Sequence, residues 1–137
     1  MVSTDTGSYA PGEGHPQIAG SFPRYLRKMV IERGELSWEQ AIAHTTLLPA
    51  QTMGLGRKGR IRAGMDADLL VFDPKTICDR ADFPGLGRPD AAPEGIRFVI
   101  VSGEVAAENG RATGVMAGKA MDSFDSIYPT HSAKAGD

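Results

Sequence analysis

The side chains best suited to metal or nucleophilic chemistry are few and widely spaced in this chain. The three histidines, His15, His44 and His131, form neither a His-x-His nor a His-x-x-x-His pair, and the single cysteine, Cys78, is far from all of them in sequence. A metal site needs about three or four converging ligands. The spacing therefore predicts no metal site formed by these residues alone.

Cys78 and His44 have simpler interpretations. No obvious base lies near Cys78 in sequence, so we interpret it as a small, semi-buried apolar residue rather than a thiol nucleophile. A single cysteine also excludes an internal disulfide framework and fits a reducing cytoplasm. His44 falls late in an expected helix, where it would stabilise the helix terminus. His131 lies in a small, polar tail and carries no prediction.

Asp66 and Asp68 have the spacing of a carboxylate pair that could perform acid–base chemistry. They follow Gly64 and directly precede an apolar run. That context favours turn and strand-entry roles, with Asp68 accepting backbone N–H bonds. The glycines of Gly54-Leu55-Gly56 are interpreted as turn residues, since they lack the strand–turn–helix setting of a phosphate-binding loop.

Composition narrows the class of protein further. The chain has 137 residues, which favours one domain, and its apolar (41%) and charged (23%) fractions are ordinary for a soluble protein. A net charge of -2 gives no reason to expect nucleic acid or an anionic membrane as a partner. The apolar runs are too short to span a bilayer. The first residues do not resemble a signal peptide, so a cytoplasmic location is expected.

Two amphipathic helices and a short third helix are expected in the first half of the chain. Between Ser21, the expected N-cap, and Gly34, the expected stop, apolar residues recur on one helical face. The run Ser37–Gln40 fits a capping box and predicts the start of the second helix. The third helix is expected from Pro49 to Met53.

The second half of the chain has the pattern of β-strands. A short strand is expected at Ile61, a strand buried on both faces at Leu69–Phe72, and a further strand at Phe98–Val101. Ser102-Gly103 and Asn109-Gly110 predict two-residue turns, so the last strands should form an antiparallel meander.

Several segments together resemble one enzyme family. Gly59 to Asp73 resembles the G-x-I-x-x-G-x-x-A-D-L-V-V-F-D segment found late in enzymes of the amidohydrolase superfamily. Other segments of Met1–Gly118 resemble N-acyl-D-amino-acid deacylases (D-aminoacylases) and follow the same order. Each segment alone is a weak signal, but their order over most of the chain makes a strong joint signal. These further segments are Thr4–Gly7, His15-Pro16, Phe22–Arg24, Leu36–Ile42 with Leu48–Ala50, and Gly95–Gly103.

This resemblance implies an α+β fold. Residues 1–58 would be the last strand and helices of a (β/α)8 amidohydrolase barrel, and residues 59–118 a small β-rich domain that forms part of a β-sandwich. Residues 119–137 would be a flexible tail. A full barrel needs about 250 residues. The catalytic machinery should therefore be incomplete in this chain, and we expect the chain alone to be inactive.

The resemblance also implies a reaction. The family hydrolyses non-peptide C–N amide bonds with a divalent metal, often zinc, which lowers the pKa of bound water and polarises the carbonyl. Its position at the end of the last barrel strand assigns Asp5 to the base that takes the water's proton and passes it to the leaving nitrogen. The family's metal ligands come from a His-x-His pair and from middle strands absent here, so no metal is expected in this chain alone.

His15, Gln17 and Arg24 are the candidate substrate-binding residues. His15 belongs to the loop after Asp5, and either lines a substrate pocket or only hydrogen-bonds its surroundings. In D-aminoacylases the residue after His-Pro is commonly an arginine, suited to a substrate carboxylate; here it is Gln17. Either the carboxylate is held outside this chain or the substrate is not a simple N-acyl-D-amino acid. Arg24 is a possible substitute, although an arginine in a first helical turn is usually only solvated.

Two alternatives stay open. The chain could be a non-catalytic β-rich domain that assembles with a separate N-terminal half or with itself, because unpaired apolar strand edges promote association. It could also belong to another amidohydrolase branch that resembles hydantoinase, dihydroorotase or imidazolonepropionase. The motif of His15-Pro16 followed by Phe22–Arg24 favours the deacylase branch, whose partner would be a small N-acyl substrate.

Overall fold

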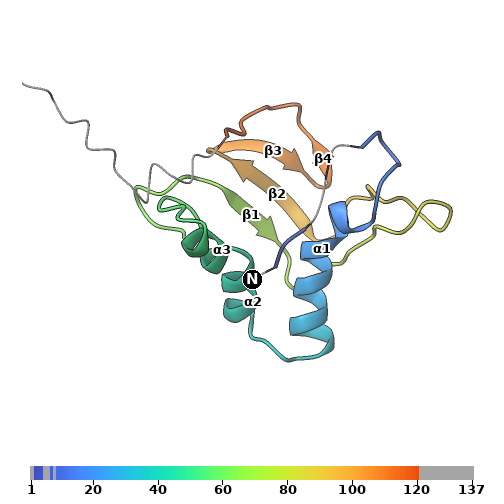
Figure 1. Cartoon of the computed structure of the whole chain (residues 1–137), viewed down its shortest axis with the longest axis horizontal. Coiled ribbons are helices and arrows are strands. Elements are labelled where there is room, and N and C mark those ends of the chain that lie inside the picture. Colours follow the sequence, from blue (N-terminus) through green and yellow to red (C-terminus); the bar gives the residue numbers. More distant parts are fainter. Residues whose placement is uncertain (1, 5–6, 8, 121–137) are drawn as a thin grey trace, which may run out of the picture.

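Helices occupy the first half of the molecule and one antiparallel sheet occupies the second (Figure 1). The structure is a computed structural model, and it describes residues 2–4, 7 and 9–120. Helices followed by an antiparallel sheet agree with the predicted α+β order. The barrel, the second sheet of a sandwich and the boundaries at residues 58 and 118 stay predictions. The helical segments are α1 (Gln17–Leu26), its π-helical continuation η1 (Arg27–Glu32), α2 (Trp38–Thr45) and α3 (Leu47–Thr52).

The sheet is a meander of four strands in the order β1-β2-β3-β4, with each neighbouring pair antiparallel. Ser102 (φ 50°) and Gly103 (φ 85°) turn the chain between β2 and β3, and Asn109 (φ 48°) and Gly110 (φ 77°) turn it between β3 and β4. Positive φ at both turn residues confirms the two predicted hairpins. The strands are β1 (Leu69–Phe72), β2 (Ile96–Val101), β3 (Glu104–Glu108) and β4 (Arg111–Ala112).

The start of the first helix differs from the prediction. Ser21 is not its N-cap, because the N-cap of α1 lies five residues earlier at Pro16, whose fixed φ of -58° is already helical. Pro23 consequently lies inside the helix. Burial of Gly20, Pro23 and Leu26 along one face favours this longer helix despite the usual cost of an interior proline. The predicted stop at Gly34 is confirmed by its φ of +61°.

The predicted start of the second helix is confirmed at the level of side chains. The Gln40 backbone N–H donates to Ser37 Oγ (3.3 Å), and the Ser37 N–H donates to Gln40 Oε1 (2.9 Å). These two bonds form the capping box. The third helix begins at Leu47, two residues before the predicted Pro49, which lies in its first turn.

Two predictions about strands were wrong. No strand forms at Ile61, which is 92% exposed and lies in a loop that the Asp66 N–H closes onto the Arg57 carbonyl at 3.0 Å. Strand β1 is not buried on both faces, since Leu70 and Val71 are exposed. Because adjacent strand residues point to opposite faces, each face of β1 is left partly uncovered by the described residues, among which β1 is also the edge of the sheet.

The core is small and lies where the helices meet β1. Leu26, Ala41 and Ile77 are buried together, and the Trp38 and Phe72 rings meet at 5.6 Å between centroids. Ile77 belongs to the 74–95 connection, which is therefore packed against the helices rather than being only a surface loop. Among the described residues, no helix is long and apolar enough to span a membrane.

Candidate functional site

The loop before α1 is fixed against the 83–90 loop. The rings of His15 and Phe83 pack edge to face at 4.9 Å between centroids, and His15 Nδ1 accepts the backbone N–H of Gln17 at 3.1 Å. The Gly12 N–H donates to Asp90 Oδ2 at 2.9 Å. Figure 1 shows the two loops, blue and yellow, on the same side of the molecule beside the start of α1. His15, which was predicted to line a pocket or to hydrogen-bond its surroundings, is therefore held by Phe83 and by the Gln17 N–H.

Arg24 binds a carboxylate of its own chain. Its Nε donates to Asp79 Oδ2 at 2.7 Å, and its Nη2 donates to the carbonyl of Ala81 at 3.4 Å. The Arg24 side chain is 59% exposed, whereas that of Asp79 is only 7% exposed. Asp79 Oδ1 also accepts the Ala81 N–H at 2.8 Å. The guanidinium thus holds the 79–81 segment on α1.

Gly20 allows this close approach. A Cβ at position 20 would lie 2.5 Å from Asp79 Oδ1, a distance that side-chain carbons do not adopt. The helix can therefore accept the Asp79 carboxylate between Gly20 and Arg24 only because position 20 lacks a side chain.

The structure places three of the four predicted site residues along α1 and its entry loop. His15, Gln17 and Arg24 are described, whereas Asp5 lies outside the described residues. The catalytic role of Asp5 and the substrate-binding roles of the other three residues stay predictions. Reasoning from sequence missed Asp79 and Phe83, which hold Arg24 and His15. No local pattern marks them, since Asp79 lies 55 positions from Arg24 along the chain.

Asp66 and Asp68 are turn residues, as predicted. Asp66 pairs with Arg57 (2.8 Å) and Lys58 (3.2 Å), while Asp68 pairs with Lys58 and accepts the Ser102 N–H at 2.8 Å. The Arg57 and Lys58 bonds lower the pKa of Asp66. The Lys58 bond, followed by the Ser102 N–H, lowers the pKa of Asp68. Both carboxylates are therefore held ionised as structural anchors.

Cys78 is a half-buried free thiol, in agreement with its interpretation as a semi-buried residue. Its backbone pairs with that of Glu94 in an isolated antiparallel bridge. Nowhere in the described ranges do three His, Cys, Asp or Glu side chains converge as metal ligands. The described residues thus do not fit a resident metal by themselves.

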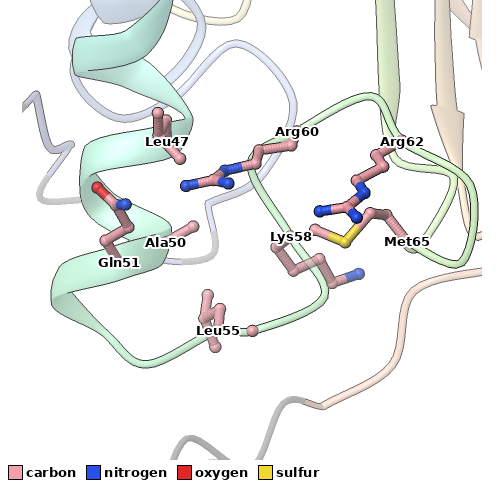
Figure 2. Close-up of a pocket in the computed structure, with 9 residues that line it drawn as sticks. Leu47, Ala50, Gln51, Leu55, Lys58, Arg60, Arg62 and Met65 are labelled. Atoms are coloured by element: carbon pink, nitrogen blue, oxygen red, sulfur yellow. The ribbon is translucent and has the colours of Figure 1, made fainter.

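Two hollows lie on the opposite side, around α3 and the 55–66 segment. The smaller, of about 250 Å³, is half open to solvent and is lined by α3 and by apolar and basic side chains of the 55–65 segment (Figure 2). The larger is a groove of about 1010 Å³ that runs from α2 and α3 to the edge strand β1. Its apolar lining includes Ile42, Met53, Ile61, Leu70 and Phe72. Neither hollow was predicted from the sequence, although Arg60 and Arg62 lie close to Gly59 in the chain.

Similarity to known proteins identifies the family of this chain. Residues 1–107 match the Amidohydrolase family. This chain belongs to the amidohydrolase family. It is 44% identical over 103 residues to the N-acyl-D-glutamate deacylase of Alcaligenes xylosoxydans xylosoxydans, a match that covers 75% of this chain and 20% of the relative.

Two solved structures resemble this amidohydrolase chain in fold and sequence. A D-aminoacylase with a binuclear metal centre superposes with a TM-score of 0.69 at 37% identity, over 75% of this chain and 21% of its own. The N-acyl-D-glutamate deacylase of Bordetella bronchiseptica, complexed with zinc and a phosphonate mimic of the tetrahedral intermediate, gives 0.63 at 37% identity, over 76% and 22%. The chain spans about a fifth of the length of these relatives.

Proposed function

We propose that this chain forms the C-terminal portion of a metal-dependent amidohydrolase that deacylates N-acyl-D-amino acids. The observation that carries the proposal is its 44% identity to an N-acyl-D-glutamate deacylase over three quarters of the chain. The fold similarity to D-aminoacylase supports the same branch. Both matches cover 75% of this chain, whereas its match to the dihydroorotase of Halobacterium salinarum covers 44%.

In this proposal, the chain supplies one reacting group, and the rest of the enzyme supplies the metal site. The metal would polarise the amide carbonyl and acidify a water molecule. Asp5 would take a proton from that water and donate it to the departing nitrogen. His15 and Gln17 would border the substrate, since the loop that carries His15 is held in place by Phe83 and Asp90.

The partner of this chain would be the N-terminal portion of the same enzyme. Within the described residues, strand β1 leaves one edge unpaired, and the groove beside it exposes apolar side chains of Ile61 and Leu70. Covering this surface would remove apolar area from water and pair the open strand edge. Self-association is the second way to cover the same surface.

A chimera tests the proposed function. Residues 1–118 would replace the matching segment of the Alcaligenes deacylase, and release of D-glutamate from its N-acetyl derivative would be measured with zinc present. We expect turnover, because the rest of the deacylase would supply the metal ligands that the described residues of this chain do not bring together. Asp5→Asn should lower kcat by about 10²- to 10⁴-fold, the usual contribution of a general base.

The matched control is Glu108→Gln, which neutralises an exposed carboxylate on β3 and should leave kcat unchanged. A chimera that folds and binds zinc but does not hydrolyse the substrate would reject the deacylase assignment. Full activity of Asp5→Asn would reject only the role of Asp5.

A further inference from the structure

The segment from Arg57 to Asp68 carries a local excess of positive charge on a chain whose net charge is negative. It contains four basic and two acidic residues. Arg57 and Lys58 are paired with the two aspartates. Arg60 and Arg62 are exposed and form no ion pair with any described residue. Two guanidinium groups therefore remain available to an external anion.

Both arginines line the smaller hollow, of about 250 Å³. Figure 2 shows Arg60 reaching from the loop toward Leu47 and Gln51 of α3, with Arg62 and Lys58 on the loop side. The rest of the wall is largely apolar. Its apolar side chains are Leu47, Ala50, Leu55 and Met65.

The loop that carries the arginines is held in one position. The Asp66 N–H donates to the Arg57 carbonyl at 3.0 Å, which closes the loop at its base. Gly59, with φ +80°, lies so close to α3 that a Cβ there would be 2.8 Å from Ala50 Cβ. Asp68 ties the end of the loop to the β2–β3 turn through the Ser102 N–H. The hollow is therefore defined by packed backbone rather than by arginine side chains alone.

We propose that this hollow binds a small monocarboxylate with a short apolar tail. The planar guanidinium groups suit the two oxygens of a carboxylate, while the aliphatic and thioether side chains suit the tail. The volume is below the roughly 300–1,000 Å³ of pockets for drug-sized ligands, which limits the occupant to a small molecule. The site lies on α3 and the 55–65 segment, away from α1, and it does not depend on the proposed deacylation.

Hexanoate is the probe for this site, with 1-hexanol as the control that keeps the tail and lacks the charge. Each is titrated into the ¹⁵N-labelled 137-residue chain, and backbone amide shifts are followed by NMR. We expect saturable hexanoate shifts confined to residues 47–65, with at least tenfold weaker binding of 1-hexanol. Equal binding of the two probes, or hexanoate shifts outside this region only, would overturn the proposal.

Two independent variants test the charges. The double change Arg60→Gln with Arg62→Gln removes both guanidinium groups, and Gln51→Glu adds a repelling carboxylate on exposed α3 without removing either arginine. Each should weaken hexanoate binding at least tenfold. Arg111→Gln, on β4, is the matched control and should leave binding unchanged. Amide dispersion in the same spectra reports whether each variant is folded. Unchanged binding in a folded Gln51→Glu protein contradicts the proposal even if the double variant does not fold.

Discussion

Gly20 and Arg24, one turn apart on α1, determine how closely the 79–81 segment approaches the helix. Between them they hold a carboxylate whose side chain is only 7% exposed. A carboxylate this poorly solvated needs a compensating donor, which Arg24 provides. Arg24, the possible substitute for a substrate-binding arginine, therefore has a structural contact within this chain.

Gly20→Ala should destabilise the protein by about 1–3 kcal/mol, because the added methyl would overlap Asp79 and force the ion pair apart. Urea denaturation monitored by circular dichroism measures the change. Gly56→Ala is the matched control: nothing lies within 4 Å of its new methyl. That substitution should change stability by less than about 1 kcal/mol. Equal effects of the two changes would show that the contact with Asp79 is unimportant.

At the scale of elements, locally encoded features were predicted and features that depend on distant partners were not. The Ser37 capping box and the two hairpin turns need only neighbouring residues, and all three are confirmed. The start of α1 was predicted wrongly because burial of one face outweighed the local preference of Ser21 for a cap. Strand formation at Ile61 was predicted wrongly because a strand needs a neighbour that the pattern cannot supply.

In the candidate site, too, the features set by neighbouring residues were predicted, and those that depend on distant residues were not. The His15-Pro16 motif identified His15 and Gln17 as candidates, but both were expected in a loop, whereas Gln17 is the first residue of α1. The contacts that hold the loop of His15 come from Phe83 and Asp90, which lie far from it in sequence. The anion-binding arrangement of Arg60 and Arg62 depends on the approach of Gly59 to α3, which only the folded chain reveals.

The ion pairs of the 57–68 segment should make stability depend on pH. Hydrogen bonds lower the pKa of Asp68, first from Lys58 and then from Ser102. The unfolded chain then binds more protons than the folded one around the unfolded pKa of about 3.9. The stabilisation is thus complete above that pKa and is lost as the pH falls through the lower folded pKa.

Asp68→Asn should therefore reduce the fall in unfolding free energy as the pH is lowered from about 6 to about 2. Asparagine keeps an oxygen that can accept the Ser102 N–H, so the turn is preserved while the charge is removed. Denaturant melts at several pH values measure the slope. Glu108→Gln, an exposed site on β3, should leave the slope unchanged. An identical slope in Asp68→Asn and the parent chain would contradict this role.

At the scale of the whole molecule, the groove along β1 is the larger of the two hollows and leaves apolar side chains exposed. Leu70 is 45% exposed on the edge strand and lines this groove. An exposed apolar strand edge favours association, and a lysine on it opposes association. The isolated chain should therefore associate in a concentration-dependent manner.

Leu70→Lys should lower the apparent mass of the isolated chain in size-exclusion chromatography with light scattering. Met116→Lys is the matched control, because Met116 is 95% exposed and does not line the groove. That change should have no effect. Equal loss of association in both variants would show that general charge repulsion, rather than the β1 edge, controls assembly.

Amide hydrolysis by the isolated chain should be measured side by side with hydrolysis by the chimera. This comparison tests whether the active site needs both this chain and the rest of the enzyme. Both proteins would receive zinc and N-acetyl-D-glutamate, and release of D-glutamate would be followed. We predict turnover by the chimera and none by residues 1–137 alone, because a metal site needs about three or four converging ligands and the described residues bring no such group together. Zinc-dependent release by the isolated chain would contradict this prediction.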